Sequence, residues 1–262
     1  MQTEKVVNYI VNWLKDYATN AGVNGFVIGI SGGIDSAVTS TLCAKTGLEL
    51  LCIEMPIHQA ASHVSRAQEH IEQLKKRFPN VRDIKVDLTP VFEEFKTEVS
   101  LEGKQTTVDM ALANTRARLR MTTLYYHAGL LGLLVAGTGN KVEDFGVGFY
   151  TKYGDGGVDL SPIADLLKSE VYEIGEFLNV PESIMKAAPS DGLFGDARSD
   201  EDQIGANYDE LEWAMQMNDL GKKGDDFSGR EKEVFEIFKS YNSGNKHKMI
   251  PIPICEIPKN LK

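Results

Sequence analysis

Apolar residues along the chain occur in two patterns, helical spacing and short continuous runs. Residues 4–18 place Val6, Val7, Ile10, Val11, Leu14 and Tyr17 on one side of an amphipathic helix. Short apolar runs at 25–29, 48–55, 82–87 and 130–136 predict strands, and the segments 37–45, 60–77, 90–99 and 109–129 between them predict helices. This alternation predicts an α/β fold with a doubly wound parallel sheet.

The pattern changes after residue 140. The glycine-rich segment 144–161 lacks periodicity and is expected to be a functional loop, and 189–205 is expected to be a mobile loop or lid. Helices are predicted near 168–178, 181–187, 208–218 and 229–242, followed by an extended proline-containing tail. We expect one domain over 1–262, with 206–262 as a helical and extended addition to it.

The segment Gly29-Ile30-Ser31-Gly32-Gly33-Ile34-Asp35-Ser36 lies between the first predicted strand and a helix expected from Ala37. Such a turn directs backbone N–H groups and a helix N-terminus at an anion. Gly32 and Gly33 are expected to adopt positive φ, and Ser36 is a candidate helix cap. The loop is neither a Walker A sequence nor a dinucleotide fingerprint. Loops after Met55 and Ala136 are expected at the same sheet edge, which predicts the active site there.

Asp35 stands where a Walker A loop has its lysine. A carboxylate beside a phosphate indicates a bridging Mg²⁺ ion, and Glu143 lies at the correct edge to be a second ligand. On position alone, a solvated glutamate at the start of a helix fits Glu143 equally well. Lys152 and Lys168 are candidates for neutralising phosphate charge, because the loop has no lysine of its own. Arg116 and Arg120 share a helix face, from which Arg118 points away.

Composition narrows the classes of function. The net charge of −10 argues against a general nucleic-acid binder, and 42% apolar with 25% charged residues is ordinary for a soluble protein. No apolar run is long enough to cross a membrane, and the start of the chain lacks a signal peptide's apolar core, so we expect a cytoplasmic protein. Cys43 and Cys52 lie in apolar runs and are expected to be buried free thiols.

Several motifs carry a resemblance to a known family. The octet Gly29–Ser36 resembles the pyrophosphate-binding loop of the N-type ATP pyrophosphatases. With it, in the order typical of NAD synthetases, occur Asn114–Met121, Gly137-Thr138, the block 149–159 (FYTKYGDGGVD), Pro189-Ser190 and His247-Lys248. The resemblance covers most of the chain. It implies a Rossmann-like, adenine-nucleotide α-hydrolase-like fold and a cytoplasmic homodimer with the site near the interface.

The resemblance also implies a reaction and its residues. ATP adenylates the nicotinate carboxylate of deamido-NAD⁺, and ammonia displaces AMP to give NAD⁺. Asp35, Lys152, Lys168 and Asp159 are the implied catalytic residues, with Asp35 and Glu143 on Mg²⁺. The implied ATP contacts are Gly29, Ile30, Ser31, Gly32, Gly33, Ile34, Asp35, Ser36, Thr138, Lys168 and Ser190. The implied deamido-NAD⁺ contacts are Arg118, Lys152, Asp159, His247 and Lys248.

The chain departs from the family pattern at the end of the second strand, where Glu54 stands in the place of an arginine found in many relatives. The segment after Glu143 is one residue longer than in some relatives. His58, His63 and His70 lie five and seven residues apart, a spacing that favours scattered surface histidines over a metal site.

Two alternatives remain. One is another enzyme with this loop, of the GMP synthetase or tRNA-modifying type; a tRNA thiolase would be expected to have paired catalytic cysteines and a basic face. The other is a nucleotide-binding sensor that has lost catalysis. For the nitrogen donor we expect free ammonia, because the chain reaches the glycine loop by residue 29 and no cysteine has the setting of an activated thiolate.

Overall fold

The computed structural model describes residues 1–59, 61–99, 101–188 and 200–262. Its strands form a parallel sheet in the order β3-β2-β1-β4. Their bounds are β1 Gly25–Gly29, β2 Glu49–Glu54, β3 Val81–Lys85 and β4 Leu133–Val135. Ala136 and Leu160 form an isolated parallel bridge, which continues the pairing beyond β4. The predicted doubly wound α/β architecture is confirmed, and the apolar runs became strands because both faces of a parallel sheet are covered.

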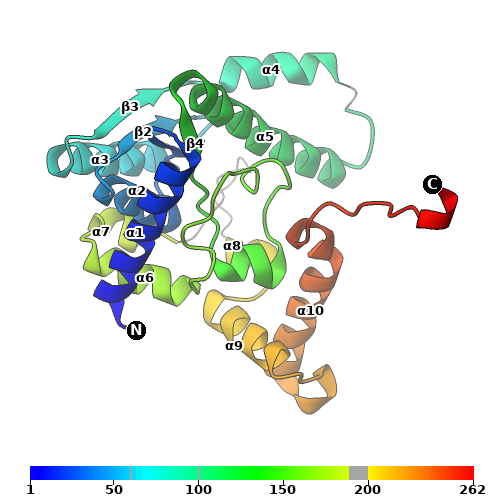
Figure 1. The fold of residues 1–262 in the computed structure, drawn as a ribbon. Helices are drawn as coiled ribbons and strands as arrows, with labels where there is room; N and C mark the ends of the chain where they lie inside the picture. The colour runs from blue at the N-terminus through cyan, green and yellow to red at the C-terminus, as the bar shows by residue number, and fades with distance from the viewer. Residues whose placement is uncertain (60, 100, 189–199) are drawn as a thin grey trace.

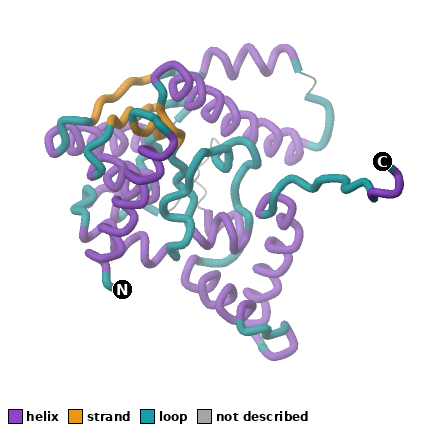
Figure 2. Tube along the Cα trace, viewed as in Figure 1, coloured by secondary structure: helices purple, strands orange, loops and turns teal. Residues whose placement is uncertain are grey.

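Helices cover both faces of the sheet (Figures 1 and 2). One core cluster joins the sheet to α1 (Thr3–Ala21), α2 (Ile34–Lys45), α3 (Ala61–Arg77), α6 (Lys168–Phe177) and α7 (Glu182–Met185). Another lies on the opposite face, against α4 (Thr89–Glu98) and α5 (Gln105–Leu131). Within β2 the residues alternate between these clusters: Leu50 and Cys52 belong to the first, and Leu51 and Ile53 to the second.

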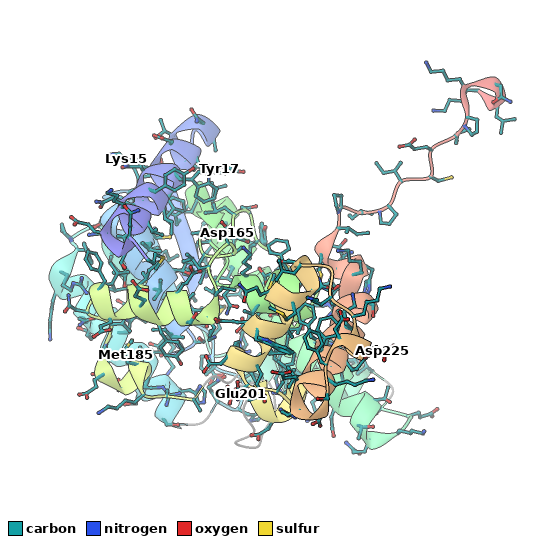
Figure 3. The ribbon with its side chains drawn as sticks, turned by 90° about the horizontal axis from the view of Figure 1, so that it is seen from below. Lys15, Tyr17, Asp165, Met185, Glu201 and Asp225 are labelled. Atoms are coloured by element: carbon teal, nitrogen blue, oxygen red, sulfur yellow. The ribbon has the colours of Figure 1, made fainter. Side chains whose placement is uncertain are left out.

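A further core cluster lies away from the sheet. It joins the π-helix η1 (Val142–Val147) to α8 (Asp200–Ile204), α9 (Tyr208–Asp219) and α10 (Gly229–Met249). Figure 1 shows α9 and α10 side by side, separated from the sheet by the loops that follow β4. Seen from below in Figure 3, Lys15 and Tyr17 of α1 lie on the side opposite Asp225, in the short 3₁₀ helix η2 (Gly224–Asp226). The single-domain assignment of 1–262 stays a prediction.

The C-terminal segment departs from the expected helix bounds. α10 continues to Met249 instead of ending near 242, and so carries His247 and Lys248 in its last turn. It stops before Pro251, because the residue preceding a proline disfavours the α conformation. Beyond it, an exposed extended tail leads away from the body to a 3₁₀ turn, η3 (Lys259–Leu261) (Figure 1).

Other local expectations also need correction. The segment 144–161 begins inside the π-helix η1, and the part of 189–205 that is described forms α8. Residues 189–199 lie outside the described residues, and so does most of the expected lid. His70 is not a surface histidine: it is fully buried, and its Nε2 lies 2.8 Å from Ser40 Oγ. Cys43 and Cys52 are buried free thiols, as expected. In the described ranges, no helix is both long and apolar enough to traverse a bilayer.

Candidate active site

The glycine loop connects β1 to α2 and takes its shape from its own residues. Gly32 has φ +81°, and a Cβ placed there would lie 2.7 Å from the carbonyl oxygen of His63, so only glycine fits. Gly33 does not have the expected positive φ; it is extended at φ −97° and precedes the first residue of α2, Ile34. The helix therefore begins three residues earlier than expected.

The loop serines bond to the loop itself. Ser31 Oγ accepts the Gly33 N–H at 3.2 Å, and Ser36 Oγ donates to the Gly33 carbonyl at 3.0 Å. Ser36 lies inside the helix and is not its cap, contrary to the expectation. The start of α2, at the positive end of the helix dipole, consequently has no side-chain cap, and its residues line a cavity. This arrangement favours a phosphate at the start of α2.

Three charged side chains meet beside this loop. Lys168 Nζ donates to Asp35 Oδ2 at 2.6 Å and to Glu143 Oε1 at 3.0 Å. The lysine side chain is only 3% exposed, and each carboxylate is 17% exposed. The three residues come from α2, η1 and α6, which are far apart in the sequence. The structure thus brings together the two predicted metal ligands and one predicted lysine.

Neutral polar groups hold these carboxylates in place. Asn140 Nδ2 donates to Asp35 Oδ1 at 3.0 Å, while Asn140 Oδ1 accepts the Glu143 N–H at 3.1 Å. The Tyr208 hydroxyl donates to Glu143 Oε1 at 2.6 Å. The Lys168 ammonium also lies 4.7 Å from the centre of the Tyr208 ring. Asn140 and Tyr208 therefore fix the orientation of both carboxylates.

Burial and charge shift the pKa values of the cluster in opposite directions. Burial raises the pKa of Asp35 above its ordinary value, although the Lys168 ammonium opposes it. Burial also acts on Glu143, but Lys168 and the Tyr208 hydroxyl together hold the pKa of Glu143 below its ordinary value. Burial disfavours the charged lysine, but Asp35 and Glu143 outweigh it and raise the pKa of Lys168. The lysine therefore remains a cation at neutral pH.

The donor set fits a magnesium ion. Mg²⁺ binds hard oxygen ligands and takes one or two carboxylates together with phosphate oxygens and water. Asp35 and Glu143 present oxygens that both lie within 3.0 Å of the same Lys168 Nζ atom. Both carboxylates lie beside the glycine loop, where phosphate oxygens would complete the coordination.

A cavity of about 590 Å³ opens above the loop. The loops that follow β1, β2 and β4 all line it, including Gly29–Ser36, Met55 and Thr138. Lys168 and Glu143 line the same cavity. The expectation that the three loops meet at one sheet edge is confirmed. Ser190 lies outside the described residues.

The residues expected to contact deamido-NAD⁺ lie mostly outside this cavity. Arg118 donates to the Lys152 carbonyl at 3.4 Å, and Lys152 Nζ donates to the His247 carbonyl at 2.8 Å, so these three residues form one chain of contacts at the surface. Lys248 does line the cavity, with its Nζ on the carbonyls of Gly148 and Tyr150 at 2.8 Å each.

Asp159 has a different setting from the one expected of a catalytic residue. Its Oδ2 accepts the Val135 N–H at 2.8 Å, and its Oδ1 accepts the Tyr125 hydroxyl at 2.9 Å. One oxygen is therefore engaged at the end of β4 and the other on α5, and Asp159 does not line the cavity. A catalytic role for Asp159 stays a prediction.

Three residues shape the site although no role in it was assigned to them from the sequence. Tyr208 and Asn140 position the carboxylates of Glu143 and Asp35. Arg120 holds the cavity wall by donating to the Met55 carbonyl at 3.1 Å and to Gln59 at 2.8 Å. Arg120 was visible as one of two arginines on a helix face. Asn140 follows the strand-end glycines and had a positional signal, whereas Tyr208 lies in an ordinary amphipathic helix and had none.

Comparison with known proteins identifies the family of this chain. The family model for NAD synthase matches residues 6–251. An NH(3)-dependent NAD(+) synthetase of Syntrophomonas wolfei is 36% identical over 267 residues, covering all of both chains. The structure of an NMN synthetase from Francisella tularensis is 33% identical with a TM-score of 0.84 and covers 99% of each chain.

A more distant solved structure supports the fold alone. The NH3-dependent NAD synthetase of Campylobacter jejuni is 24% identical, with a TM-score of 0.77 over 98% of this chain and all of that one. The known reaction of the family is the ATP-dependent amidation of deamido-NAD, which forms a C–N bond. The chain belongs to the NAD synthase family.

Proposed function

We propose that this chain converts deamido-NAD⁺, ATP and ammonia to NAD⁺, AMP and pyrophosphate through an adenylated carboxylate. One observation carries the proposal: Asp35, Glu143 and Lys168 converge on the glycine loop at the edge of a cavity that can hold a nucleotide. Family membership supplies the reaction, and this geometry supplies the groups that phosphoryl chemistry requires.

In the first step, a carboxylate oxygen of deamido-NAD⁺ attacks the α-phosphorus of ATP, and the bond to the pyrophosphate oxygen breaks. The glycine loop and the start of α2 hold the departing pyrophosphate with backbone N–H groups. Lys168 supplies a buried positive charge beside it. Magnesium held by Asp35 and Glu143 would neutralise further phosphate charge when bound. The protein needs no covalent nucleophile for this step.

In the second step, ammonia attacks the activated carbonyl carbon, AMP leaves with the oxygen that joined it to the carbonyl, and one proton is lost to solvent or a base. Ammonia fits as the nitrogen donor because a glutamine amidase needs an activated thiolate. Burial raises the pKa of Cys52 to about 12 and raises that of Cys43 as well. Cys255 is exposed in the tail and does not line the cavity.

We further propose that the enzyme is a homodimer whose partner completes the deamido-NAD⁺ site. Arg118, Lys152 and His247 are linked to one another at the surface, outside the cavity that holds the catalytic cluster. These three residues can bind a second nucleotide if a partner chain covers them. A cytoplasmic location suits an enzyme that consumes ATP and has three free cysteines.

Nicotinate mononucleotide is a second possible acyl substrate, to be compared directly with deamido-NAD⁺. The similarity to the Francisella tularensis NMN synthetase makes nicotinate mononucleotide a candidate for the acyl substrate. It carries the same reacting carboxylate and lacks the adenylyl half, so the catalytic cluster would act identically on it. The two substrates are distinguished by their kcat/KM values on the same preparation.

The test is a product assay on the purified chain with ATP, Mg²⁺ and ammonium chloride, using deamido-NAD⁺ and nicotinate mononucleotide in parallel. We expect equal amounts of NAD⁺, AMP and pyrophosphate with deamido-NAD⁺, and little product when ammonia-free glutamine replaces ammonium. Higher kcat/KM for the mononucleotide would reassign the substrate. Binding of ATP without release of AMP would identify a sensor and contradict the proposal.

A further inference from the structure

Glu54, the last residue of β2, is a largely buried residue whose carboxylate the catalytic cluster does not use. It is 7% exposed and lines the cavity. Among the described residues, no hydrogen bond or ion pair reaches its carboxylate. Burial raises its pKa above the ordinary value, with Lys85 opposing the shift and Asp83 adding to it. Its carboxylate therefore offers the cavity a hydrogen-bond acceptor that a bound ligand can use.

The alternation of β2 determines which side of the sheet Glu54 faces. Leu50 and Cys52 pack into the core cluster that includes Ala67 and Ile71 of α3. Because side chains alternate along a strand, Glu54 is on this same face, beneath α3. Val64 and Ala67 of α3 line the same cavity and contribute apolar surface to it. This part of the cavity therefore combines apolar side chains of α3 with the Glu54 carboxylate.

Glu54 is also close to the phosphate-binding loop. The Ile30 N–H donates to the Ile53 carbonyl at 3.0 Å, which places the end of β2 directly beside the start of the loop. Neighbouring strands lie about 4.8 Å apart. A nucleotide whose phosphates lie at Ser31–Ser36 can thus reach the end of β2 with its nucleoside.

The chemistry of the carboxylate limits what it can bind there. A phosphate would be repelled, so the complementary groups on ATP are its neutral donors, the ribose hydroxyls and the 6-amino group of adenine. In dinucleotide-binding α/β folds, an acidic residue about 20 residues after the glycine turn accepts hydrogen bonds from ribose. Glu54 follows Gly33 by about that number and occupies the corresponding strand end.

We propose that Glu54 is a specificity-determining residue for ATP, whose carboxylate accepts a hydrogen bond from the nucleoside. The inference rests on the proposed function only in that ATP binds in this cavity. The proposed role of Glu54 differs from that of Asp35, because Glu54 recognises the nucleoside and takes no part in holding metal or phosphate. Loss of the carboxylate should therefore weaken ATP binding while leaving the metal requirement unchanged.

The test measures nucleotide affinity by isothermal titration calorimetry for the wild type, Glu54→Ala and Glu54→Gln. We expect Glu54→Ala to raise the Kd for ATP by about ten- to a hundredfold, the range for a hydrogen bond to a charged group. Glu54→Gln keeps an acceptor oxygen and should lose less. Glu49→Ala, at the opposite end of the same strand and paired with Arg82, is the matched control and should bind ATP normally. Thermal melting establishes that each variant is folded.

Three analogues identify the donor: 2′-deoxy-ATP, 3′-deoxy-ATP and purine riboside triphosphate, which lacks the 6-amino group. The analogue without the bonded group should bind wild type and Glu54→Ala equally, whereas the others should still distinguish them. Equal ATP affinity for wild type and folded Glu54→Ala, or the same loss with ATP and all three analogues, would overturn the inference. No ATP binding by wild type would instead contradict the proposed function itself.

Discussion

Lys168 Nζ lies 2.6 Å from Asp35 Oδ2, joining the first turn of α6 to the first turn of α2. The lysine is 3% exposed, so this contact is made in a low-dielectric setting, with Glu143 as a second partner. An isolated buried charge is costly, and a buried cluster of one ammonium and two carboxylates is tolerated only with good geometry. We interpret the cluster as a preorganised site in which a metal and phosphates replace part of these internal contacts.

Asp35→Asn should abolish adenylation while leaving the fold intact. The amide keeps the size of the side chain but removes the charge that holds metal. We expect a loss of roughly a hundredfold or more in AMP formation. Asp165→Asn is the matched control, because Asp165 is an exposed aspartate that pairs with Lys141 outside the cavity. Near-normal AMP formation by a folded Asp35→Asn variant would remove Asp35 from the metal site.

Tyr208→Phe tests whether the hydroxyl on Glu143 positions a metal ligand. Residues that orient a ligand typically change metal affinity or activity about 10- to 100-fold. We expect kcat/KM to fall by about tenfold and the Mg²⁺ concentration for half-maximal activity to rise. Tyr126→Phe, at a tyrosine that is 65% exposed, should change neither. A purely structural role for Tyr208 would lower thermal stability and leave the Mg²⁺ dependence unaltered.

Gly32→Ala and Gly33→Ala form a matched pair within the loop. At Gly32 the alanine must adopt φ +81° and place its Cβ 2.7 Å from the His63 carbonyl oxygen. At Gly33 the backbone is extended, and the nearest atom is Ser31 Oγ at 3.4 Å. Strain of about 1–3 kcal/mol is expected only for Gly32→Ala. Urea unfolding and ATP titration should show the larger loss at Gly32, and equal effects at both glycines would refute the loop geometry.

His70 should make stability fall as the pH decreases. Burial lowers its pKa from 6.5 to about 4, so the unfolded chain takes up a proton before the folded protein does. The contribution is complete above pH 6.5 and is lost progressively from there down to about pH 4. Between pH 7.5 and 5, urea unfolding should show a loss of about 2 kcal/mol. In His70→Gln, the free energy of unfolding should change much less between these two pH values. An unchanged pH dependence in this variant would exclude His70 as its source.

The sequence predicted the sheet and its ligand-binding edge well, because parallel strands and covering helices leave strong periodic signals. Asp35, Glu143 and Lys168 were candidates because phosphoryl chemistry requires these types of residue near the loop, and the resemblance to NAD synthetases supported them. The partners of these residues could not be identified from the sequence, because Tyr208 contacts Glu143 only through the packing of α9 against η1. His70 was mistaken for a surface residue because its burial depends on the contact of α3 with α2. The conformation of Gly33 also depended on where α2 begins, which spacing alone did not determine.

The most direct test of the account follows an oxygen atom through the reaction. Deamido-NAD⁺ labelled with ¹⁸O in its nicotinate carboxylate is incubated with the enzyme, ATP, Mg²⁺ and ammonium chloride, and the products are analysed by mass spectrometry. Attack of the carboxylate on the α-phosphorus predicts one ¹⁸O atom in AMP for each doubly labelled molecule converted, one retained in NAD⁺, and none in pyrophosphate. Unlabelled AMP, or label in pyrophosphate, would contradict adenylation at the site formed by Asp35, Glu143 and Lys168.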